Sequence, residues 1–284
     1  MDIVDLYCGI GGFSAGAMEA GCKPIAGYDC DDSALRLWSG NTGGKGVVTT
    51  LWKGRVRLPA PRANLHIHLS PPCIDLSSAK RGASGTAIDN GKDGIRQAIQ
   101  VVLDYKYTSW SLENVSTPTV RELLDEFAIR APDLVAYTTV DAADLGAPTT
   151  RRRLIAGPPA MIERLRETPV HRVSVADAFA AAGVNLPAQY IKNSTRSRDG
   201  SACIRSVSSQ AHTQTASHPL TWCHADGRTV RCLTVEETAI IQGFPQKWML
   251  PRGSRAGIRG LGNAVAPPVA RAVMRAACEV VGGH

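Results

Sequence analysis

The feature that most constrains the fold is a short apolar strand that runs straight into a glycine-rich turn. Residues 3–7 are apolar and β-prone, residues 9–12 (GIGG) can form a tight turn, and residues 13–20 have helical composition. A second strand over residues 24–28 follows and ends at Asp29. This order predicts a βαβ unit, in which a crossover helix joins two parallel strands.

The same alternation continues through the first half of the chain. Further strands are expected over residues 65–69, 108–112, 135–140 and 153–156, with helices over 33–38, 95–103 and 120–129. Residues 74–94 are rich in Ser, Gly, Asp and Lys, which favours a long loop. Strands that alternate with helices predict an α/β fold, here a Rossmann-like, mostly parallel sheet with helices on both faces.

The regular pattern stops after residue 157. Residues 158–230 are rich in Pro, Ser, Thr, His and Arg, with one clear helix over 175–182, and they predict a second, smaller and irregular domain. Regularity returns with a capping box, Thr234 and Glu237, and ends with an amphipathic helix over 267–281. We expect one domain over 1–157 plus 258–284 and a small domain over 158–257.

Composition narrows the class of protein but does not identify it. The chain has 284 residues, 44% of them hydrophobic, and a net charge of +7, which favours a polyanionic partner. No apolar run reaches the roughly 20 residues that span a bilayer. The N-terminus lacks the basic region of a signal peptide, so an intracellular protein with reduced thiols is expected. The eight cysteines include no C-x-x-C pair, and no metal site is expected.

Polar residues follow several of the expected strands at their carboxyl ends, where open α/β sheets bind ligands. Asp29 after the glycine turn suits the ribose of an adenosine-containing cofactor, although the pattern is shorter than the dinucleotide fingerprint. Cys73 follows two prolines and is either a nucleophile or a buried small side chain. Glu113 can act as an acid or hydrogen-bond a substrate nitrogen, or it can be a capping or salt-bridged residue.

Three consecutive arginines precede the strand over 153–156. In β geometry Arg151 and Arg153 point to one face and Arg152 to the other, so two guanidinium groups could share a phosphate or carboxylate. A solvated basic run is the alternative interpretation.

In order along the chain, these segments resemble the cytosine-C5 DNA methyltransferase family. The matching segments are DLYCGIGGFSAG at 5–16, GYDCDD at 27–32, SPPC at 70–73, LENV at 112–115, APTTRRRLIAG at 147–157, RCLTVEETAIIQGFP at 231–245 and GNAVAPPVARAV at 262–273. The resemblance spans nearly the whole chain. It implies a methyl transfer from S-adenosyl-L-methionine to C5 of a flipped-out cytosine.

The resemblance also implies a role for individual residues. Cys73 would attack C6 of the cytosine, Glu113 would contact N3 and the exocyclic amine, and Arg153, with Arg151 nearby, would stabilise the adduct. The positions expected to bind the cofactor are Tyr7, Gly9, Gly11, Gly12, Asp29, Cys30, Pro72 and Asn263. Residues 158–230 would form the segment that recognises the target sequence, with Arg172, Lys192, Arg196, Arg198, Arg205 and Arg228 as candidate phosphate contacts.

The chain departs from the family pattern at three places. Ile74 follows the cysteine where Gln is usual, and Thr149 replaces the Gln before the arginines. An acidic residue that would hold the adenine amine is absent near Val48. The residues with chemical roles are all present, so an active enzyme is expected.

We expect double-stranded DNA as the partner, a monomer, and a cytoplasmic location, or a nuclear one in a eukaryote. The sequence leaves open whether a cognate restriction endonuclease accompanies the protein. A tRNA cytosine-C5 methyltransferase, which SPPC also resembles, and a DNA-binding homologue without catalysis are the alternatives. A nicotinamide dehydrogenase would explain the glycine turn but not SPPC or LENV.

Overall fold

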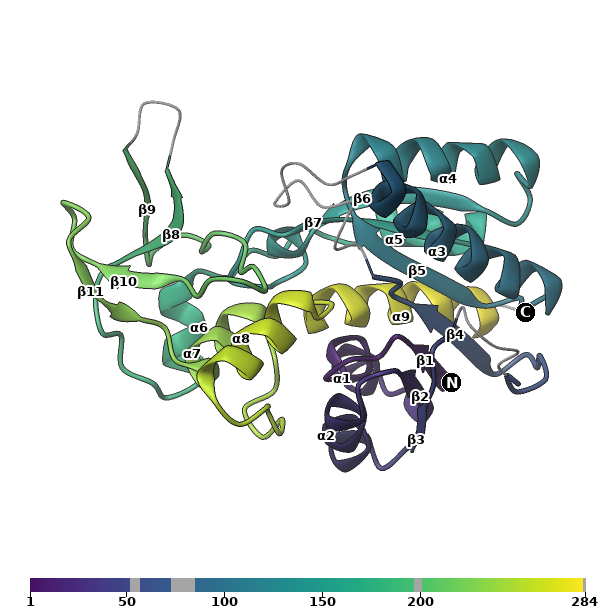
Figure 1. The fold of residues 1–284 in the computed structure, drawn as a ribbon, viewed down its shortest axis with the longest axis horizontal. Coiled ribbons are helices and arrows are strands. Elements are labelled where there is room, and N and C mark those ends of the chain that lie inside the picture. The colour runs from purple at the N-terminus through teal and green to yellow at the C-terminus, as the bar shows by residue number, and fades with distance from the viewer. Residues whose placement is uncertain (52–56, 73–84, 197–200, 283–284) are drawn as a thin grey trace.

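The largest element of the fold is a mixed seven-stranded sheet (Figure 1). The computed structural model describes residues 1–51, 57–72, 85–196 and 201–282. Within them the sheet consists of β1 (Asp2–Leu6), β2 (Lys23–Asp29), β3 (Lys45–Val48), β4 (Leu65–Leu69), β5 (Trp110–Val115), β6 (Ala136–Asp141) and β7 (Arg152–Gly157). The order in space is β3-β2-β1-β4-β5-β7-β6, and β7 runs antiparallel to both of its neighbours. The predicted Rossmann-like α/β sheet is confirmed.

The strand order reverses at β1, which pairs in parallel with β2 on one side and with β4 on the other. The connections that leave these strands therefore diverge, and a crevice opens beyond their carboxyl ends. The glycine turn after β1, the end of β2 and the prolines after β4 all lie at this edge of the sheet.

Helices cover both faces of the large sheet. They are α1 (Gly12–Glu19), α2 (Asp32–Thr42), α3 (Gly85–Asp104), α4 (Pro118–Arg130), α5 (Pro159–Arg166) and α9 (Pro267–Gly282). One hydrophobic core joins α3 and α4 to the sheet, and a second joins α1, α5 and α9 to the opposite face (Figure 1). Val4 belongs to the first core and Ile3 to the second. A strand buried on both faces is therefore apolar at consecutive positions rather than alternating.

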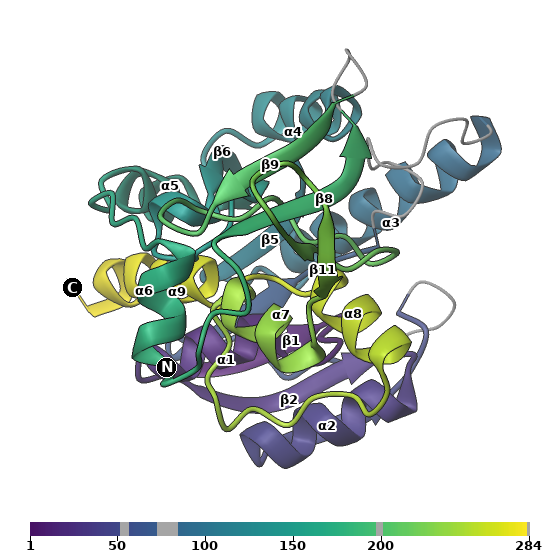
Figure 2. The ribbon, with the colours of Figure 1, turned by 90° about the vertical axis from the view of Figure 1, so that its left-hand side faces the viewer.

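A small antiparallel sheet forms the centre of the second domain (Figure 2). Its strands are β8 (Tyr190–Arg196), β9 (Ala202–Ser206), β10 (Thr221–Cys223) and β11 (Thr229–Cys232), in the order β11-β10-β8-β9. The helices α6 (Val175–Ala181) and α7 (Val235–Gln242) pack against it. The rings of Phe179 and Trp222 meet edge to face, with their centroids 5.4 Å apart. The predicted capping box of Thr234 and Glu237 begins α7.

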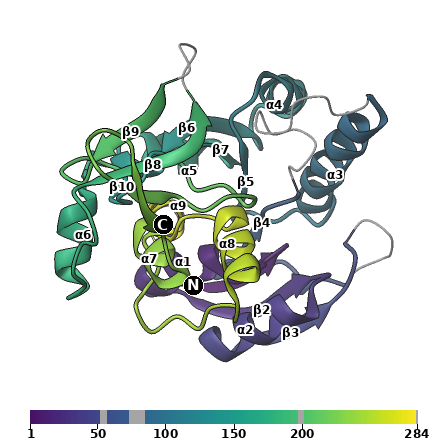
Figure 3. The same ribbon diagram turned by 60° about the vertical axis from the view of Figure 1, so that its left-hand side comes forward.

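The helix α8 (Ser254–Asn263) lies between the small sheet and the unit of β2 and α2 (Figure 3). Its buried side packs against α7 through Gly257 and Leu261. The sequence pattern did not indicate α8, because Gly257, Gly260 and Gly262 make it a weak helix former. Its stability comes from packing rather than from propensity.

The structure changes two details of the expected organisation. α5 falls in the predicted small domain, but Met161, Ile162 and Leu165 pack in the same core as α9, so we propose that the domain boundary follows Arg166. Residues 85–94, expected as loop, form the first half of α3. Ile95, Ile99 and Val102 of that helix are fully buried, and this burial outweighs the poor helix propensity of the preceding segment. Among the described residues, no helix has the length and apolar character needed to cross a membrane.

Candidate active site

A cavity of about 300 Å³ lies at the carboxyl ends of β1, β2, β4 and β5. It contains the cofactor positions expected from the sequence, except Gly11. Its lining includes Tyr7, Gly9, Gly12, Asp29, Cys30, Pro72, Glu113 and Asn263. Segments that are far apart in the sequence therefore meet at one site, as the strand topology requires.

The glycine turn after β1 brings the backbone close to this cavity. Gly9 and Gly11 have φ values of 51° and 88°, a region that side chains with a Cβ rarely adopt. A Cβ on Gly12 would lie 2.1 Å from the carbonyl oxygen of Val265. Gly9 and Gly11 thus permit the turn, whereas Gly12 permits close packing of α1 against the segment that leads into α9.

Asp29 is held at the mouth of the cavity by backbone donors. Its Oδ2 accepts a hydrogen bond from the Gly9 N–H at 2.8 Å, and its Oδ1 accepts one from the Asp31 N–H at 2.9 Å. A carboxylate oxygen can accept more than one hydrogen bond, so Asp29 can also receive ribose hydroxyls. The residues present therefore fit an adenosine-containing cofactor.

The side of the cavity where an acidic residue was missing is lined by Thr49, Thr50 and Leu51. Arg259 of α8 also lines the cavity, and its guanidinium lies 3.8 Å from the Asp31 carboxylate. Sequence analysis did not single out Arg259. The sequence feature that could have identified it is the four-residue spacing of Arg255, Arg259 and Asn263. This spacing places the three side chains on one face of a helix.

Glu113, which lines the cavity, forms an ion pair with Arg153. Arg153 Nε lies 2.8 Å from Glu113 Oε1, and the two side chains are 14% and 9% exposed. The strands that carry them, β5 and β7, are neighbours away from the edges of the sheet, with Glu113 opposite Ile155 and Val115 opposite Arg153. Sequence analysis placed both residues at the site but did not foresee their pairing.

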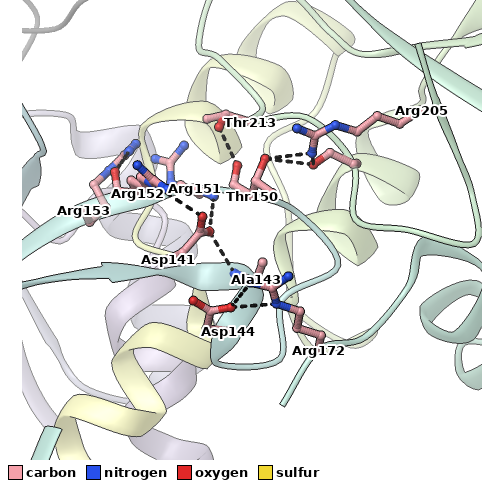
Figure 4. Close-up of polar contacts among 11 residues, drawn as sticks. Asp141, Ala143, Asp144, Thr150, Arg151, Arg152, Arg153, Arg172, Arg205 and Thr213 are labelled. Atoms are coloured by element: carbon pink, nitrogen blue, oxygen red, sulfur yellow. Dashed lines mark hydrogen bonds and ion pairs between the residues drawn. The ribbon is translucent and has the colours of Figure 1, made fainter. Parts of the chain in front are cut away.

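Arg151 has a structural task that the sequence interpretation did not include. Its side chain is 2% exposed and donates hydrogen bonds to the backbone carbonyls of Gln214, Gly262 and Ala264 at 2.9–3.1 Å. Its own N–H donates to Asp141 at 2.8 Å (Figure 4). Arg151 thus ties the small domain to the turn between α8 and α9.

The neighbouring threonines make further links between the domains. The Thr149 hydroxyl donates to the His212 carbonyl at 2.9 Å, and Thr150 accepts a hydrogen bond from Arg205 (Figure 4). Thr149 is fully buried. Thr149, which replaces the usual Gln, therefore lies at the contact between the two domains.

The proposed nucleophile Cys73 and its neighbour Ile74 lie outside the described residues. The segment that leads to them is held by a residue of β5. The Asn114 side chain donates to the Pro71 carbonyl at 3.0 Å, and Pro71 and Pro72 line the cavity. Asn114 of β5 therefore holds the described part of the SPPC turn in place.

The basic residues of the recognition segment are mostly paired within the protein. Arg172 pairs with Asp144 and Arg228 with Asp226, both in exposed positions, while Lys192 donates to the Gly227 carbonyl. Arg205 donates to the carbonyls of Gln210 and Ala211 as well as to Thr150. Arg198 lies outside the described residues, as does the environment of the Arg196 side chain.

Several known proteins are similar to the chain. It is 26% identical to the type II methyltransferase M.AplI of Arthrospira platensis over 298 residues, which cover 96% of this chain and 84% of the relative. A prophage-encoded protein of E. coli assigned as a DNA modification methyltransferase has a TM-score of 0.69 at 18% identity, with all of both chains covered. The Dnmt2 methyltransferase of S. pombe has a TM-score of 0.62 at 14% identity, with 99% of both chains covered.

These two structural likenesses concern the fold. The match to a family model is more specific, because the model described as C-5 cytosine-specific DNA methylase matches residues 1–157 and 162–279. It covers both domains and every described site residue named above that the sequence analysis predicted. The chain therefore belongs to the C-5 cytosine-specific DNA methylase family, whose members use S-adenosylmethionine.

Proposed function

We propose that the protein is a DNA (cytosine-5-)-methyltransferase. The observation that carries this proposal is that Glu113, paired with Arg153, lines the same cavity as Gly9, Gly12 and Asp29. A carboxylate for the base and a glycine turn for the cofactor thus share one site. Family membership supports this interpretation.

S-adenosyl-L-methionine supplies an electrophilic methyl group when it is bound. Asp29 would accept bonds from its ribose hydroxyls, and the backbone of Gly9, which lines the cavity, would approach it closely. The other residues proposed to hold it are Tyr7, Gly12, Cys30, Pro72 and Asn263, and the structure brings all of them to the cavity lining.

Cys73 is the proposed nucleophile. Its thiolate would donate an electron pair to C6 of a cytosine, and the electrons of the C5–C6 double bond would form the new bond between C5 and the methyl group. The bond between the methyl group and sulfur would break at the same time and leave S-adenosylhomocysteine. A base would then take the C5 proton, and the C6–S bond would break to restore the double bond. Within the described residues, Cys8 and Cys30 line the cavity, and burial raises the pKa of both thiols above the usual value, that of Cys8 well above it. A buried neutral thiol is a poor nucleophile, which favours Cys73.

Glu113 is proposed to bind the Watson–Crick edge of the flipped base. Its Oε1 is already paired with Arg153, so Oε2 remains to accept a hydrogen bond from the exocyclic amine. Arg153 keeps the carboxylate in place and adds positive charge beside the site where the adduct forms. Arg151 is proposed to act indirectly, by holding the segment that carries Arg153.

DNA is the proposed substrate because the type II relative is similar along 96% of this chain. The tRNA alternative is retained because the SPPC segment also resembles that branch and a Dnmt2 protein shares the fold. For phosphate contacts we favour Arg172 and Arg228, whose side chains are 61% and 76% exposed. Lys192 and Arg205 are less suitable, since their charged groups already donate to backbone carbonyls.

One incubation separates the proposed function from its alternatives. Labelled S-adenosylmethionine is supplied with duplex DNA or with tRNA, and the product is digested to nucleosides. Label in 5-methyldeoxycytidine supports the proposal, whereas label in 5-methylcytidine alone supports the tRNA enzyme. DNA binding without label would indicate a homologue that has lost catalysis.

A second experiment tests the nucleophile. Duplex DNA that contains 5-fluorocytosine has no C5 proton to remove, so the covalent adduct should accumulate with the wild-type protein and not with Cys73→Ala. Cys203→Ala, in the small domain, serves as the matched control and should still form the adduct. An adduct with Cys73→Ala would assign the nucleophile to another residue.

A further inference from the structure

A line of hydrogen bonds runs through the interior of the large sheet and ends at the cavity. His66 lies between Ser109 and Ser111, with its ring nitrogens 2.8 Å from each hydroxyl. His68 lies between Ser111, at 2.9 Å, and Ser70, at 3.0 Å. The chain Ser109–His66–Ser111–His68–Ser70 therefore follows the strands β4 and β5 from one end of the sheet to the other.

The chain is sealed from solvent everywhere except at Ser70. Both histidines and Ser111 are at most 1% exposed, and Ser109 is 4% exposed. Phe13, which lines the cavity, stacks on the His68 ring with a centroid distance of 3.4 Å. Ser70 lines the same cavity beside Pro71 and Pro72. The His68 ring is thus held by Phe13 on one face and by Ser111 and Ser70 at its two nitrogens.

Both imidazole rings are neutral. Burial lowers the pKa of His66 to about 3, and burial followed by the charge of His66 lowers the pKa of His68 well below its usual value. A neutral imidazole has one N–H donor and one acceptor nitrogen, and a serine hydroxyl has one proton. If Ser111 donates to one ring and accepts from the other, all four bonds must run in the same direction.

The far end of the chain favours one of the two directions. If the bonds ran from Ser70 toward Ser109, the Ser109 proton would be left with the Met1 sulfur at 4.0 Å, a weak acceptor. If they run toward Ser70, the Ser109 hydroxyl donates to the better acceptor, His66 Nδ1. In this direction His68 donates to Ser70, and the Ser70 proton stays available for the cavity.

We propose that Ser70 is a cofactor-binding residue whose hydroxyl donates to an acceptor atom of bound S-adenosylmethionine, with His68 as its positioning residue. This inference rests on the proposed function, because it takes that cofactor as the occupant of the cavity. His66, Ser109 and Ser111 act at longer range by setting the direction of the bonds.

The first test measures binding of S-adenosylhomocysteine by calorimetry, so it does not depend on turnover. Loss of one hydrogen bond should raise the Kd of Ser70→Ala about tenfold, and Ser70→Thr should restore most of the affinity. Ser109→Ala, at the far end of the chain, should also weaken binding. Ser208→Ala, in an exposed loop of the small domain, is the matched control and should bind like the wild type.

The second test uses nitrogen-15 NMR of labelled imidazole side chains in the wild-type protein. Both His66 and His68 should carry their proton on Nε2, and Ser109→Ala should shift part of the population to Nδ1. Protonation on Nδ1 in both wild-type rings would overturn the inference, as would a Ser70→Ala Kd within twofold of the wild-type value. Wild-type protein that binds S-adenosylhomocysteine but methylates neither DNA nor tRNA would instead overturn the proposed function alone.

Discussion

Arg153 Nε lies 2.8 Å from Glu113 Oε1, across two antiparallel strands whose register offsets the two residues by two positions. Side chains offset in this way lie on the same face of a sheet, so the pair follows directly from the register of β5 and β7. Neither side chain is more than 14% exposed. The carboxylate is therefore held in one orientation at the cavity before any substrate arrives.

This relationship predicts a selective loss of activity in Glu113→Gln. The glutamine side chain has no negative charge and one acceptor oxygen in place of two. It therefore cannot pair with Arg153 and bind the base as the carboxylate does, and we expect kcat to fall about 10²-fold to 10³-fold. Affinity for S-adenosylhomocysteine should stay within about twofold, because Asp29 and the glycine turn are untouched. Methylation assays and calorimetry measure the two quantities.

Arg164→Ala is the control for this experiment. Arg164 is exposed on α5 and pairs with Glu167, so its loss should leave both quantities unchanged. Equal losses of cofactor affinity and kcat in Glu113→Gln would indicate a general disturbance of the cavity rather than a role at the base.

Arg151→Met should destabilise the fold rather than remove a chemical group. The change deletes three hydrogen bonds to buried carbonyls, which predicts a loss of about 3 kcal/mol or more in the free energy of unfolding. Urea denaturation measures this loss. Arg152→Met changes the adjacent, 79% exposed side chain and should cost less than about 0.5 kcal/mol. Similar stability of the two variants would show that the carbonyl contacts contribute little.

Gly12 and Gly94 should respond in opposite ways to the same change. Gly12→Ala would place a Cβ 2.1 Å from the Val265 carbonyl oxygen, so α1 and the segment before α9 must separate, and both stability and cofactor binding should fall. Gly94 lies inside α3 with nothing within 4 Å of its added Cβ, so Gly94→Ala should stabilise the protein by up to about 1 kcal/mol. Thermal unfolding of both variants measures the difference. A Gly12→Ala protein as stable as the wild type would contradict this packing argument.

Much of the large domain could be predicted from the sequence, because its signals are local. The strand expected over residues 65–69 has the same bounds as β4, and Thr234 and Glu237 make the capping box that their spacing indicates. The small sheet could not be predicted in the same way. Its middle strands, β8 and β10, pair although β9 lies between them in the sequence, and the burial pattern of β11 shows four exposed residues with no apolar stripe to detect.

The candidate site shows the same division between local and tertiary information. Motif positions brought Asp29, Glu113 and Asn263 to one cavity, because each follows from where a strand or helix ends. The role of Arg151 depends on carbonyls 63 to 113 residues away. No local pattern carries such a contact, so strand alternation and the family resemblance assigned Arg151 a chemical role beside Arg153.

Asp5 should make stability depend on pH. Burial raises the pKa of this fully buried carboxyl from 3.8 to about 7, with Ser14 donating to it at 2.6 Å. The stabilisation from the protonated carboxyl is complete below about pH 4 and is lost as the pH rises through about 7. The effect is roughly 4 kcal/mol at most, on the order of 1.4 kcal/mol per pKa unit.

Asp5→Asn isolates this contribution. Relative to the variant, the wild-type protein should lose stability progressively as the pH rises from 4 to 8, measured by urea denaturation at each pH. The opposite trend expected from His66, whose pKa is lowered, is present in both proteins and cancels in the difference. A difference in stability that is constant with pH would show that Asp5 stays ionised.

Cys22 and Cys278 should form a disulfide on mild oxidation. Their sulfur atoms lie 3.6 Å apart although 256 positions separate them in the sequence, because α1 packs along α9. The bond from Cys22 lowers the pKa of Cys278 to about 6, which makes Cys278 the thiolate at neutral pH. That thiolate would attack one sulfur of oxidised glutathione, releasing reduced glutathione. The Cys22 thiol would then displace a second glutathione and lose its proton to water.

The product would weigh 2 Da less than the reduced protein. Cys278→Ser should prevent the mass change, and Cys203→Ser should not. Closing so long a loop restricts the unfolded chain, so the oxidised protein should also unfold at a higher temperature. A stable mixed disulfide with glutathione, without loss of 2 Da, would mean that the two sulfurs do not meet in solution.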